Sequence, residues 1–425
     1  MSFPSIRGGL SLDARDKDAL SGRLGEGPRM AMRVVVAIAD AVGAERLIDV
    51  TSAHVDGCLY QGRVSLDFAE RLAETGARVA IPTTLNVGAV DLLHPDHYRG
   101  PAHAAGRGRR LMELYVQMGC RPTWTCAPYQ TREARPALGQ HVAWAESNAI
   151  VFANSVLGAR TERYGDFVDI CAAVTGRVPD AGLHRTERRR GQVVLRLSGV
   201  PEGLLRDDIV YPVLGHLVGR LVGSRVPVIE GLPPEVSEDQ LKAMGAAAAS
   251  SGSVGLFHAV GVTPEAPTLA DALGGGEADQ SGEITLEDLR RARDDLSTAG
   301  GDAIDAVSTG TPHASRHQLE RIADLLAGRP VAVPLFVSTG RDTLAQAGDT
   351  AGRLEGSGAT LVTDTCTYIA PIIDPAARVV MTDSAKWAYY APANIGVDVV
   401  FGTLGECVRS AVEGRVWRDP DLFGG

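Results

Sequence analysis

The stretch that decides the fold is Ala303-Ile304-Asp305-Ala306-Val307-Ser308-Thr309-Gly310-Thr311-Pro312-His313-Ala314-Ser315, which is followed by residues 316–326. Residues 303–307 form an apolar run that predicts a buried strand, and residues 316–326 have the apolar spacing of an amphipathic helix. We therefore predict a strand-to-helix turn over residues 308–315, with Pro312 in the first helical turn. Ligands of open α/β sheets bind at the carboxyl ends of strands, so His313 lies where a ligand would be met. The alternative is a helix start that carries a surface histidine.

Three earlier units share this design. Strand 46–50 leads into the polar turn 51–60, strand 78–82 leads into residues 83–88, and a helix over 109–118 precedes residues 122–129. Such successive helix–strand–turn units predict a parallel or mixed sheet with its site at one edge. The predicted fold class is α/β, built from helix–strand units with the site where strand-end turns converge. We expect an N-terminal region over 1–191, a middle region over 192–330 and a C-terminal region over 331–425.

Composition excludes several classes of function. The chain has 425 residues and a formal net charge of -10, which disfavours nucleic acid as a partner. No stretch reaches the roughly 18 consecutive apolar residues of a transmembrane helix, and residues 1–7 lack a signal-peptide pattern. The six cysteines are widely scattered without a CxxC pair, which suits a reducing compartment. These features predict a cytoplasmic protein without a membrane partner.

Several polar residues interrupt an apolar segment near residue 150. Glu146, Ser147, Asn148, Asn154 and Ser155 lie on or beside a stretch that would otherwise be buried. Because buried polar groups need partners, these side chains pair with one another, cap turns or face a ligand.

Seven short segments that span most of the chain carry a family resemblance. They are 52–60 (SAHVDGCLY), 82–86 (PTTLN), 125–129 (TCAPY), 145–148 (AESN), 153–155 (ANS), 310–315 (GTPHAS) and 363–366 (TDTC). In these segments and their order the chain resembles the large catalytic subunit of aconitase X, a branch of the aconitase superfamily.

The resemblance implies an aconitase-like core of three α/β regions that dehydrates a hydroxylated carboxylic acid beside an iron–sulfur cluster. Substrates of that family are cis-3-hydroxy-L-proline and mevalonate 5-phosphate. A small swivelling domain completes the family's site, and we expect it to be absent from this chain. The resemblance thus implies a separate small subunit and a heterodimer.

One position departs from the family pattern. Two of three cluster ligands match Cys126 and Cys366, whereas the third position is Thr311. Thiolate is the usual ligand of such clusters, and a hydroxyl is a hard, poorly acidic substitute. Either two thiolates hold a smaller or labile cluster, with His313 or Cys58 as a third ligand, or the site has lost its metal. Ala385 stands where the family has glycine before Lys386, with slight consequences.

The chemistry of dehydration assigns further roles. Removing water from a β-hydroxy acid needs a base, an acid or Lewis acid, and donors to the substrate carboxylate. His54 and His313 are candidate proton carriers because an unperturbed imidazole titrates near neutrality. Lys386 is a candidate carboxylate ligand, or an acid if no metal is present; its alternative role is a solvated surface lysine. The expected substrate-binding residues are Ser52, Thr83, Thr84, Asn86, Glu146, Ser147, Asn148 and Ser155.

Three functions remain open from the sequence. The first is a hydro-lyase acting on a small hydroxylated carboxylic acid. The second is a cluster-free relative that catalyses another isomerisation, cyclisation or lyase reaction. The third is a non-enzymatic binding or regulatory protein, which the acidic charge and the few aromatic residues disfavour.

Overall fold

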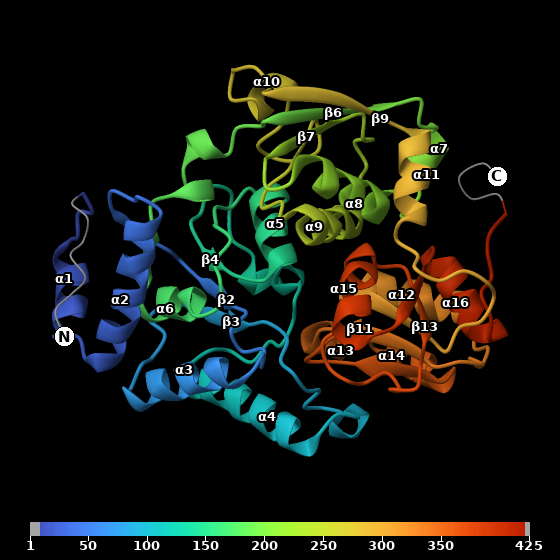
Figure 1. Cartoon of the computed structure of the whole chain (residues 1–425), viewed down its shortest axis with the longest axis horizontal. Helices are drawn as coiled ribbons and strands as arrows, with labels where there is room; N and C mark the ends of the chain where they lie inside the picture. Colours follow the sequence, from blue (N-terminus) through green and yellow to red (C-terminus); the bar gives the residue numbers. More distant parts are fainter. Residues whose placement is uncertain (1–8, 421–425) are drawn as a thin grey trace.

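The computed structural model describes residues 9–420, which form three α/β regions around a common centre (Figure 1). The N-terminal segment in which the sequence showed no signal-peptide pattern lies outside the described residues. Each region contains a parallel sheet, with three, four and five strands in chain order. The α/β class predicted from the sequence is therefore confirmed.

The first region places a three-stranded parallel sheet, in the order β3-β2-β4, among helices. A separate antiparallel pair, β1 with β5, covers the N-terminal helices. The elements of the first region are α1 (Ala14–Ser21), α2 (Glu26–Ala41), β1 (Leu47–Asp49), β2 (Ala53–Val55), α3 (Arg63–Glu74), β3 (Thr83–Leu85), α4 (Ala102–Gln117), β4 (Ala143–Trp144), α5 (Ser147–Ser155), α6 (Val168–Thr175) and β5 (Arg177–Pro179), with short 3-10 turns between them.

The middle region has a four-stranded parallel sheet in the order β8-β7-β6-β9. Helices α8 and α9 approach closely because glycines face each other: a Cβ on Gly252 would lie 2.0 Å from the carbonyl oxygen of Gly219. The elements are β6 (Val193–Ser198), α7 (Glu202–Leu205), α8 (Val210–Val222), β7 (Pro227–Glu230), α9 (Glu238–Gly252), β8 (His258–Ala259), α10 (Leu269–Ala272), β9 (Gln280–Thr285) and α11 (Leu286–Asp294).

The third region has five parallel strands in the order β12-β11-β10-β13-β14. The chain first adds strands on one side of β10 and then on the other, so β10 and β13 flank a topological switch point. The elements are β10 (Ala306–Ala314), α12 (Arg316–Leu326), β11 (Leu335–Thr339), α13 (Arg341–Gln346), α14 (Asp349–Gly356), β12 (Ala359–Val362), β13 (Val379–Thr382), α15 (Ala385–Ile395), β14 (Asp398–Phe401) and α16 (Leu404–Glu413).

The stretch 308–315 differs from its prediction. It is mostly strand, because β10 continues to Ala314, and Pro312 lies before the helix rather than inside it. Helix α12 starts after Ser315, which forms a capping box with Gln318. The register with β11 shifts between Thr309 and Ala314. Gly310 fits this irregularity, because its φ is 80° and a Cβ would lie 2.2 Å from the carbonyl oxygen of Ser338.

Strand pairing also moves a region boundary. The sequence analysis placed residues 306–326 in the middle region, but β10 pairs with β11 and β13. The third region therefore begins near residue 304 instead of 331. Two smaller features concern single elements. Strand β3 lies at 83–85 instead of 78–82. Helices α13 and α14 are separated at Gly348, whose φ is 59°.

The core is made of aliphatic side chains and crosses the region boundaries. One cluster joins α8 and α9 of the middle region to α15 of the third, through Met244, Ala248 and Trp387. All six cysteines are buried and free. Between residues 9 and 420 there is no helix with both the length and the apolarity needed to cross a bilayer.

Arg177 joins the outer elements of the first region. It forms two hydrogen bonds with the buried Asp16 of α1, at 2.9 and 3.1 Å, and one with Asp49 of β1, at 3.0 Å. Removing one partner of a buried ion pair leaves a charge without compensation.

We therefore expect Arg177→Ala to lower the free energy of unfolding by about 3 kcal/mol. Urea titration followed by circular dichroism measures this change. The matched control is Arg63→Ala, which removes an exposed pair with Asp67 and should cost less than about 1 kcal/mol. Equal costs for the two variants would contradict the role of the buried pair.

Candidate active site

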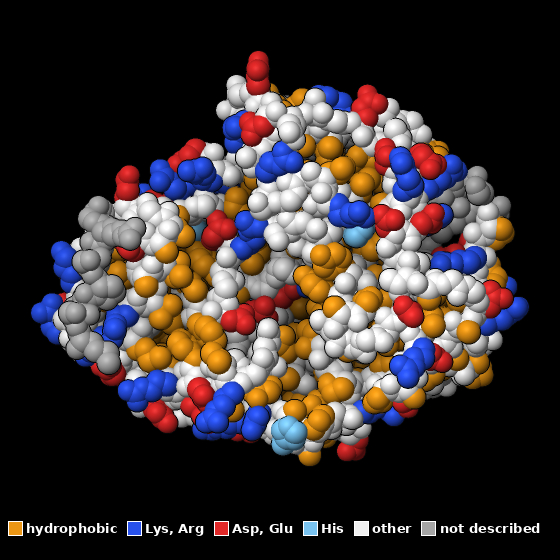
Figure 2. All heavy atoms as spheres, in the orientation of Figure 1, with side chains coloured by type: hydrophobic (Ala, Val, Ile, Leu, Met, Phe, Trp, Pro, Cys, Tyr) orange, Lys and Arg blue, Asp and Glu red, His pale blue; other side chains and the backbone are white. Residues whose placement is uncertain are grey.

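The first and third regions meet where their strands end. His54 and Thr84 lie in β2 and β3 of the first sheet, and His313 lies near the end of β10. Lys386 begins the helix that follows β13, on the other side of the switch point. On the face shown in Figure 2, acidic side chains gather in a hollow between the two regions. The convergence of strand ends predicted from the sequence is therefore seen in the fold.

Two thiols and an imidazole come together at this junction. Potential ligand atoms of Cys126, His313 and Cys366 lie within 4.8 Å of one another, and all three residues are buried. The backbone N–H of His313 donates a hydrogen bond to the Cys126 sulfur at 3.3 Å. Burial opposes ionisation of the Cys126 thiol, but its hydrogen bond with Cys366 and the nearby His313 lower its pKa. The same hydrogen bond raises the pKa of Cys366, so one thiolate forms first.

The hydrogen bonds of His313 define its tautomer. Its Nε2 lies 3.1 Å from the carbonyl oxygen of Thr365, which can only accept, so Nε2 carries the proton. Its Nδ1 lies 3.1 Å from the hydroxyl of Thr125 and is therefore the unprotonated nitrogen. In this tautomer the lone pair of Nδ1 accepts a hydrogen bond from Thr125, which a proton or a metal ion would have to replace.

Thr311 bears on whether these residues fit an iron–sulfur cluster. Its hydroxyl oxygen is buried and has no hydrogen-bond partner within residues 9–420. Burying a hydroxyl without a hydrogen-bond partner costs free energy. The buried hydroxyl of Thr311 therefore points to a bound group that is not part of the chain. Together with two thiols and an imidazole lone pair, this donor set fits a cluster bound by two thiolates.

A buried ion pair connects the two regions beside the thiols. The ammonium group of Lys386 donates to the Glu146 carboxylate, and it lies 3.3 Å from the hydroxyl of Ser147. Burial opposes the charge on Lys386, but the Glu146 carboxylate outweighs it and raises the pKa of the ammonium. Burial also opposes the charge on Glu146, and Lys386 in turn lowers that pKa. Both groups are therefore charged near neutral pH, and Lys386 is not a solvated surface lysine.

Glu146 also organises the loop that carries Cys126. Its carboxylate caps α5 by accepting from the N–H of Ala149 at 2.8 Å, and it accepts from the amide of Asn148 at 2.5 Å. The same Asn148 amide donates to the carbonyl oxygen of Cys126 at 2.6 Å. The hydroxyl of Tyr129 donates to the Asn148 oxygen at 2.5 Å. Of the polar residues near 150, Glu146, Ser147 and Asn148 pair with one another. Asn154 instead donates to the carbonyl oxygens of Thr161 and Gly255.

His54 and Asp56 complete the centre from β2. The Nδ1 of His54 contacts the Thr84 hydroxyl at 2.8 Å, whereas its buried Nε2 has no partner among the described residues. Burial lowers the pKa of His54 to about 4, so the ring is neutral at pH 7. Burial, with Glu146 and Asp166, raises the pKa of Asp56 to about 8, although a hydrogen bond from the Asn86 amide opposes this.

Two expected substrate-binding residues, Ser155 and Thr83, make other contacts. The Ser155 hydroxyl accepts from the N–H of Phe257 at 2.9 Å and thereby joins α5 to the middle region. The Thr83 hydroxyl donates to the carbonyl oxygen of Ile81 at 2.9 Å. Ser52 precedes β2 and Thr83 begins β3, so both lie toward the amino ends of their strands.

Sequence reasoning did not single out Asp56, Thr125, Tyr129 or Tyr368. Asp56 and Thr125 belong to polar segments already noted in the sequence, but nothing in the sequence showed that Asp56 is buried. Tyr368 is buried close to Lys386 and Cys366, and burial raises the pKa of its phenol. In the sequence, the only feature that could have indicated Tyr368 is its position two residues after Cys366.

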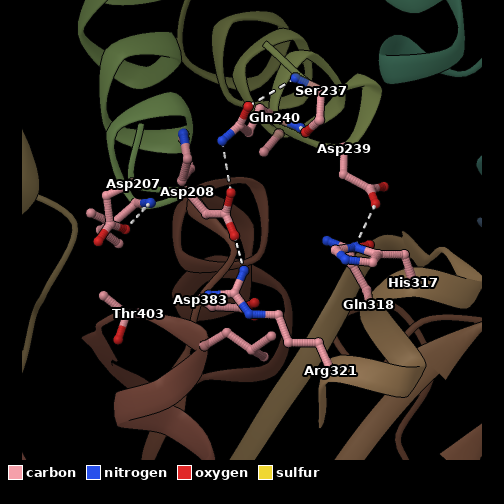
Figure 3. A pocket seen from close by; sticks show the side chains of 14 residues that line it. Asp207, Asp208, Ser237, Asp239, Gln240, His317, Gln318, Arg321, Asp383 and Thr403 are labelled. Carbon is pink, nitrogen blue, oxygen red and sulfur yellow. Dashed lines mark hydrogen bonds and ion pairs between the residues drawn. The ribbon is translucent and has the colours of Figure 1, made fainter. Parts of the chain in front are cut away.

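Figure 3 shows a separate small cavity of about 90 Å³ between the middle and third regions. Arg321 of α12 pairs there with Asp208, and Asp208 also accepts from Gln240 at 2.9 Å. On the opposite side Asp239 lies 3.9 Å from His317. The charges of these groups compensate one another across the boundary between the middle and third regions. The cavity is therefore part of the packing between these regions, and the thiols do not line it.

Comparisons with known proteins agree with this architecture. Family models for the first, second and third domains of aconitase X match residues 9–187, 191–294 and 304–413. The structure resembles that of aconitase X from Thermococcus kodakaraensis in its holo-form, with a TM-score of 0.85 and 32% identity. That match covers 95% of this chain and 100% of the other.

Named relatives define the enzyme class. Cis-3-hydroxy-L-proline dehydratase of Pseudomonas aeruginosa is 45% identical over 96% of this chain and 71% of its own length. Phosphomevalonate dehydratase large subunit of Methanothermobacter thermautotrophicus is 37% identical over 95% of this chain and 99% of its own length. These proteins are dehydratases, so the fold and the matches define a carbon–oxygen hydro-lyase. The chain belongs to the aconitase X family, as its sequence motifs predicted.

The ion pair yields a prediction that separates stability from activity. Lys386→Met leaves the Glu146 carboxylate buried without its partner and should cost about 3–5 kcal/mol of unfolding free energy. In the double variant Glu146→Gln/Lys386→Met no charge is left unpaired, so the total cost should be smaller than the sum of the single variants. Urea unfolding of the four proteins measures the coupling.

Dehydratase activity should stay lost in the double variant, because the ammonium is absent from the site. Arg316→Met is the control, since it removes an exposed pair with Glu320. The role given to Lys386 would be contradicted if the losses of unfolding free energy in the two single variants simply added up in the double variant. Restored activity in a stable double variant would contradict it as well.

Asp56 yields a pH prediction. Its pKa is about 8 in the folded chain and about 4 when unfolded, so the folded state binds the proton more tightly. The stabilisation of the folded state that comes from this difference in pKa is fully present below about pH 4 and is lost as the pH rises toward 8. Asp56→Asn should therefore flatten the fall of unfolding free energy between pH 5 and 8. Thermal unfolding at several pH values checks this, and an unchanged slope would contradict burial of Asp56 as a neutral acid.

Proposed function

We propose that the chain dehydrates a β-hydroxylated amino acid of the cis-3-hydroxy-L-proline type. The observation that carries the proposal is the buried junction at which Lys386 and Glu146 lie beside two thiols, with His54 and Asp56 close to Glu146. The 45% identity with the Pseudomonas aeruginosa dehydratase, over almost the whole chain, supports the same substrate class.

The charges of the site favour an amino acid over a phosphorylated acid. The cations near the centre are already paired: Lys386 with Glu146, and Arg341 with Asp364. Carboxyl groups gather around them, and burial raises the pKa of Asp56 and of Asp169. A phosphate dianion together with a carboxylate needs more cationic charge than the paired Lys386 and Arg341 supply, whereas one substrate carboxylate needs only Lys386. Mevalonate 5-phosphate is thus the less favoured substrate.

The proposed proton path uses His54 and Asp56 of the first region, and Lys386 of the third region binds the substrate carboxylate. His54 accepts the α-proton of the substrate at its unpaired Nε2, and the Lys386 ammonium stabilises the substrate carboxylate as its charge grows. The carbon–oxygen bond breaks at the β-carbon, and the leaving hydroxyl takes a proton from the neutral Asp56 to become water. His313 holds the thiol loop in position through Thr125 and Cys126.

We also propose that Cys126 and Cys366 bind an iron–sulfur cluster, with the Thr311 hydroxyl at the third position. When bound, such a cluster supplies a Lewis acid for the leaving hydroxyl. The unpaired Thr311 oxygen and the lone pair of His313 support this assignment. The cluster-free relative is the alternative, and Asp56 would then protonate the leaving group without help from a metal.

A separate small subunit belongs to the proposal. The Methanothermobacter relative is named a large subunit and is matched over 99% of its length, whereas 71% of the Pseudomonas protein is matched. We propose that a small partner completes the site as a heterodimer. A cytoplasmic location accords with the free, buried cysteines.

The test is a product assay with the chain co-expressed with its small partner. Cis-3-hydroxy-L-proline should be consumed with release of water and formation of an unsaturated or keto product, and mevalonate 5-phosphate should react at least about tenfold more slowly. Chromatography with mass spectrometry follows both reactions. His54→Gln should lower kcat by about 100-fold or more, in line with the loss of a general base. Preference for the phosphorylated acid, or turnover unaffected by His54→Gln, would overturn the proposal.

A further inference from the structure

A second group of potential metal ligands lies outside the site described above. Ligand atoms of Asp91, His94 and His97 lie within 4.8 Å of one another. The Nδ1 of His94 is 3.0 Å from Asp91 Oδ2, and the Nδ1 of His97 is 3.9 Å from the same oxygen. The two rings stack, with centroids 5.0 Å apart and planes inclined by 19°.

The local backbone explains why the two rings share one side. His94 precedes the 3-10 helix Pro95–His97, and the N–H of His97 donates to the carbonyl oxygen of His94 at 3.0 Å. A 3-10 helix has three residues per turn, so side chains three positions apart lie above one another. The spacing Asp-x-x-His-x-x-His therefore places three potential metal-ligand side chains in a row.

Asp91 is fixed in place before any ligand arrives. Its Oδ1 accepts hydrogen bonds from the N–H groups of Leu93 and His94, both at 2.9 Å. The hydroxyl of Thr363 donates to Oδ1 at 2.9 Å, and its N–H donates to Oδ2 at 2.8 Å. Oδ2 therefore keeps one lone pair, directed at the histidines. Such support of a ligating carboxylate is typical of metal sites.

His97 is the residue that a purely structural role does not explain. Its Nδ1 is buried, yet it has no hydrogen-bond partner among residues 9–420. Burial lowers the pKa of His97, which keeps the ring in the neutral form that binds metal ions. About 29% of the side chain is exposed, so an ion and its water ligands can reach the site from solvent.

We propose that Asp91, His94 and His97 bind a divalent transition-metal ion of the Zn²⁺ type. Two imidazoles and one carboxylate suit such an ion and do not suit Mg²⁺ or Ca²⁺, which prefer oxygen ligands. Tetrahedral bonds of about 2.0–2.1 Å separate neighbouring ligand atoms by about 3.3 Å, between the two separations seen here. His94 binds the ion through Nδ1 in the tautomer that carries its proton on Nε2, and water completes the coordination.

The site lies on a contact between the first and third regions. Thr363, which holds Asp91, is followed by Asp364, and Asp364 accepts from the N–H of Leu92 at 2.9 Å. Asp364 also pairs with Arg341 of α13. A bound ion thus fixes residues 91–97 against the segment that leads to Cys366, and it should stabilise the junction of the two regions.

The test is calorimetric titration of Zn²⁺ into the untagged full-length chain. The variant Cys126→Ala/Cys366→Ala is titrated in parallel, because its thiols are a second source of zinc binding. One equivalent should bind in this variant, and adding His94→Ala or His97→Ala should weaken that binding by more than about tenfold. The matched control is His103→Ala, an exposed histidine of the nearby α4, which should change nothing.

Thermal unfolding supplies a second readout. Zn²⁺ should raise the midpoint of the chain with both histidines and leave that of His97→Gln unchanged, because ligands that bind only the folded state stabilise it. His97→Gln keeps a polar side chain of similar size if His97→Ala fails to fold. Unchanged zinc affinity in both histidine variants, or no zinc binding once the two thiols are removed, would overturn the proposal.

Discussion

The ion pair between Lys386 and Glu146 is the constraint on which the centre of the molecule depends. Each partner comes from a different region, and each is buried. A buried ammonium or carboxylate without its partner is strongly destabilising, so the two regions are stable in this arrangement only when they are docked. Docking then brings Cys126 to Cys366, because Glu146 holds the Cys126 loop through Asn148. The geometry of the thiols is thus a consequence of an electrostatic requirement.

Strand order explains why the site lies where it does. In the third sheet the strand order reverses at β10, which leaves space at the carboxyl ends of β10 and β13. His313 and Lys386 occupy this place from the third region, and β2 and β3 supply His54 and Thr84 from the first. Parallel sheets that face each other with their carboxyl ends can concentrate polar groups at one point while their other strand residues build aliphatic cores.

Much of the fold and several site residues could be predicted from the sequence. The apolar run 303–307 located the start of β10 to within a few residues, and the capping box of Ser315 with Gln318 defines the start of α12. The motifs also indicated His54, Cys126, His313, Cys366 and Lys386, which the fold brings to one junction. These residues stand out because reactive side chains in strand-end segments are unusual in a chain this rich in aliphatic residues.

The errors share a physical cause. Residues 53–55, 83–85 and 308–314 were expected to form turns because they are polar, yet they are strands. Their hydroxyl and imidazole groups find partners inside the protein, for example Ser308 with Thr367 at 2.7 Å within the third region and His313 with Thr125 of the first region at 3.1 Å. Polarity there does not imply exposure. The turning of Ser155 toward the N–H of Phe257 depends on a contact between regions, and the burial of Asp56 depends on residues distant in sequence such as Glu146 and Asp169. Local sequence patterns encode neither.

The central claim is that the junction binds an iron–sulfur cluster through two thiolates although Thr311 replaces the third. The most direct measurement is iron and acid-labile sulfide content, with an absorbance spectrum, on protein purified without oxygen together with its small partner. We predict bound iron and sulfide that are lost in Cys366→Ala and retained more firmly in Thr311→Cys, with Thr309→Cys as the matched control. Protein that lacks iron and sulfide yet still dehydrates its substrate would contradict the claim and assign the chemistry to side chains alone.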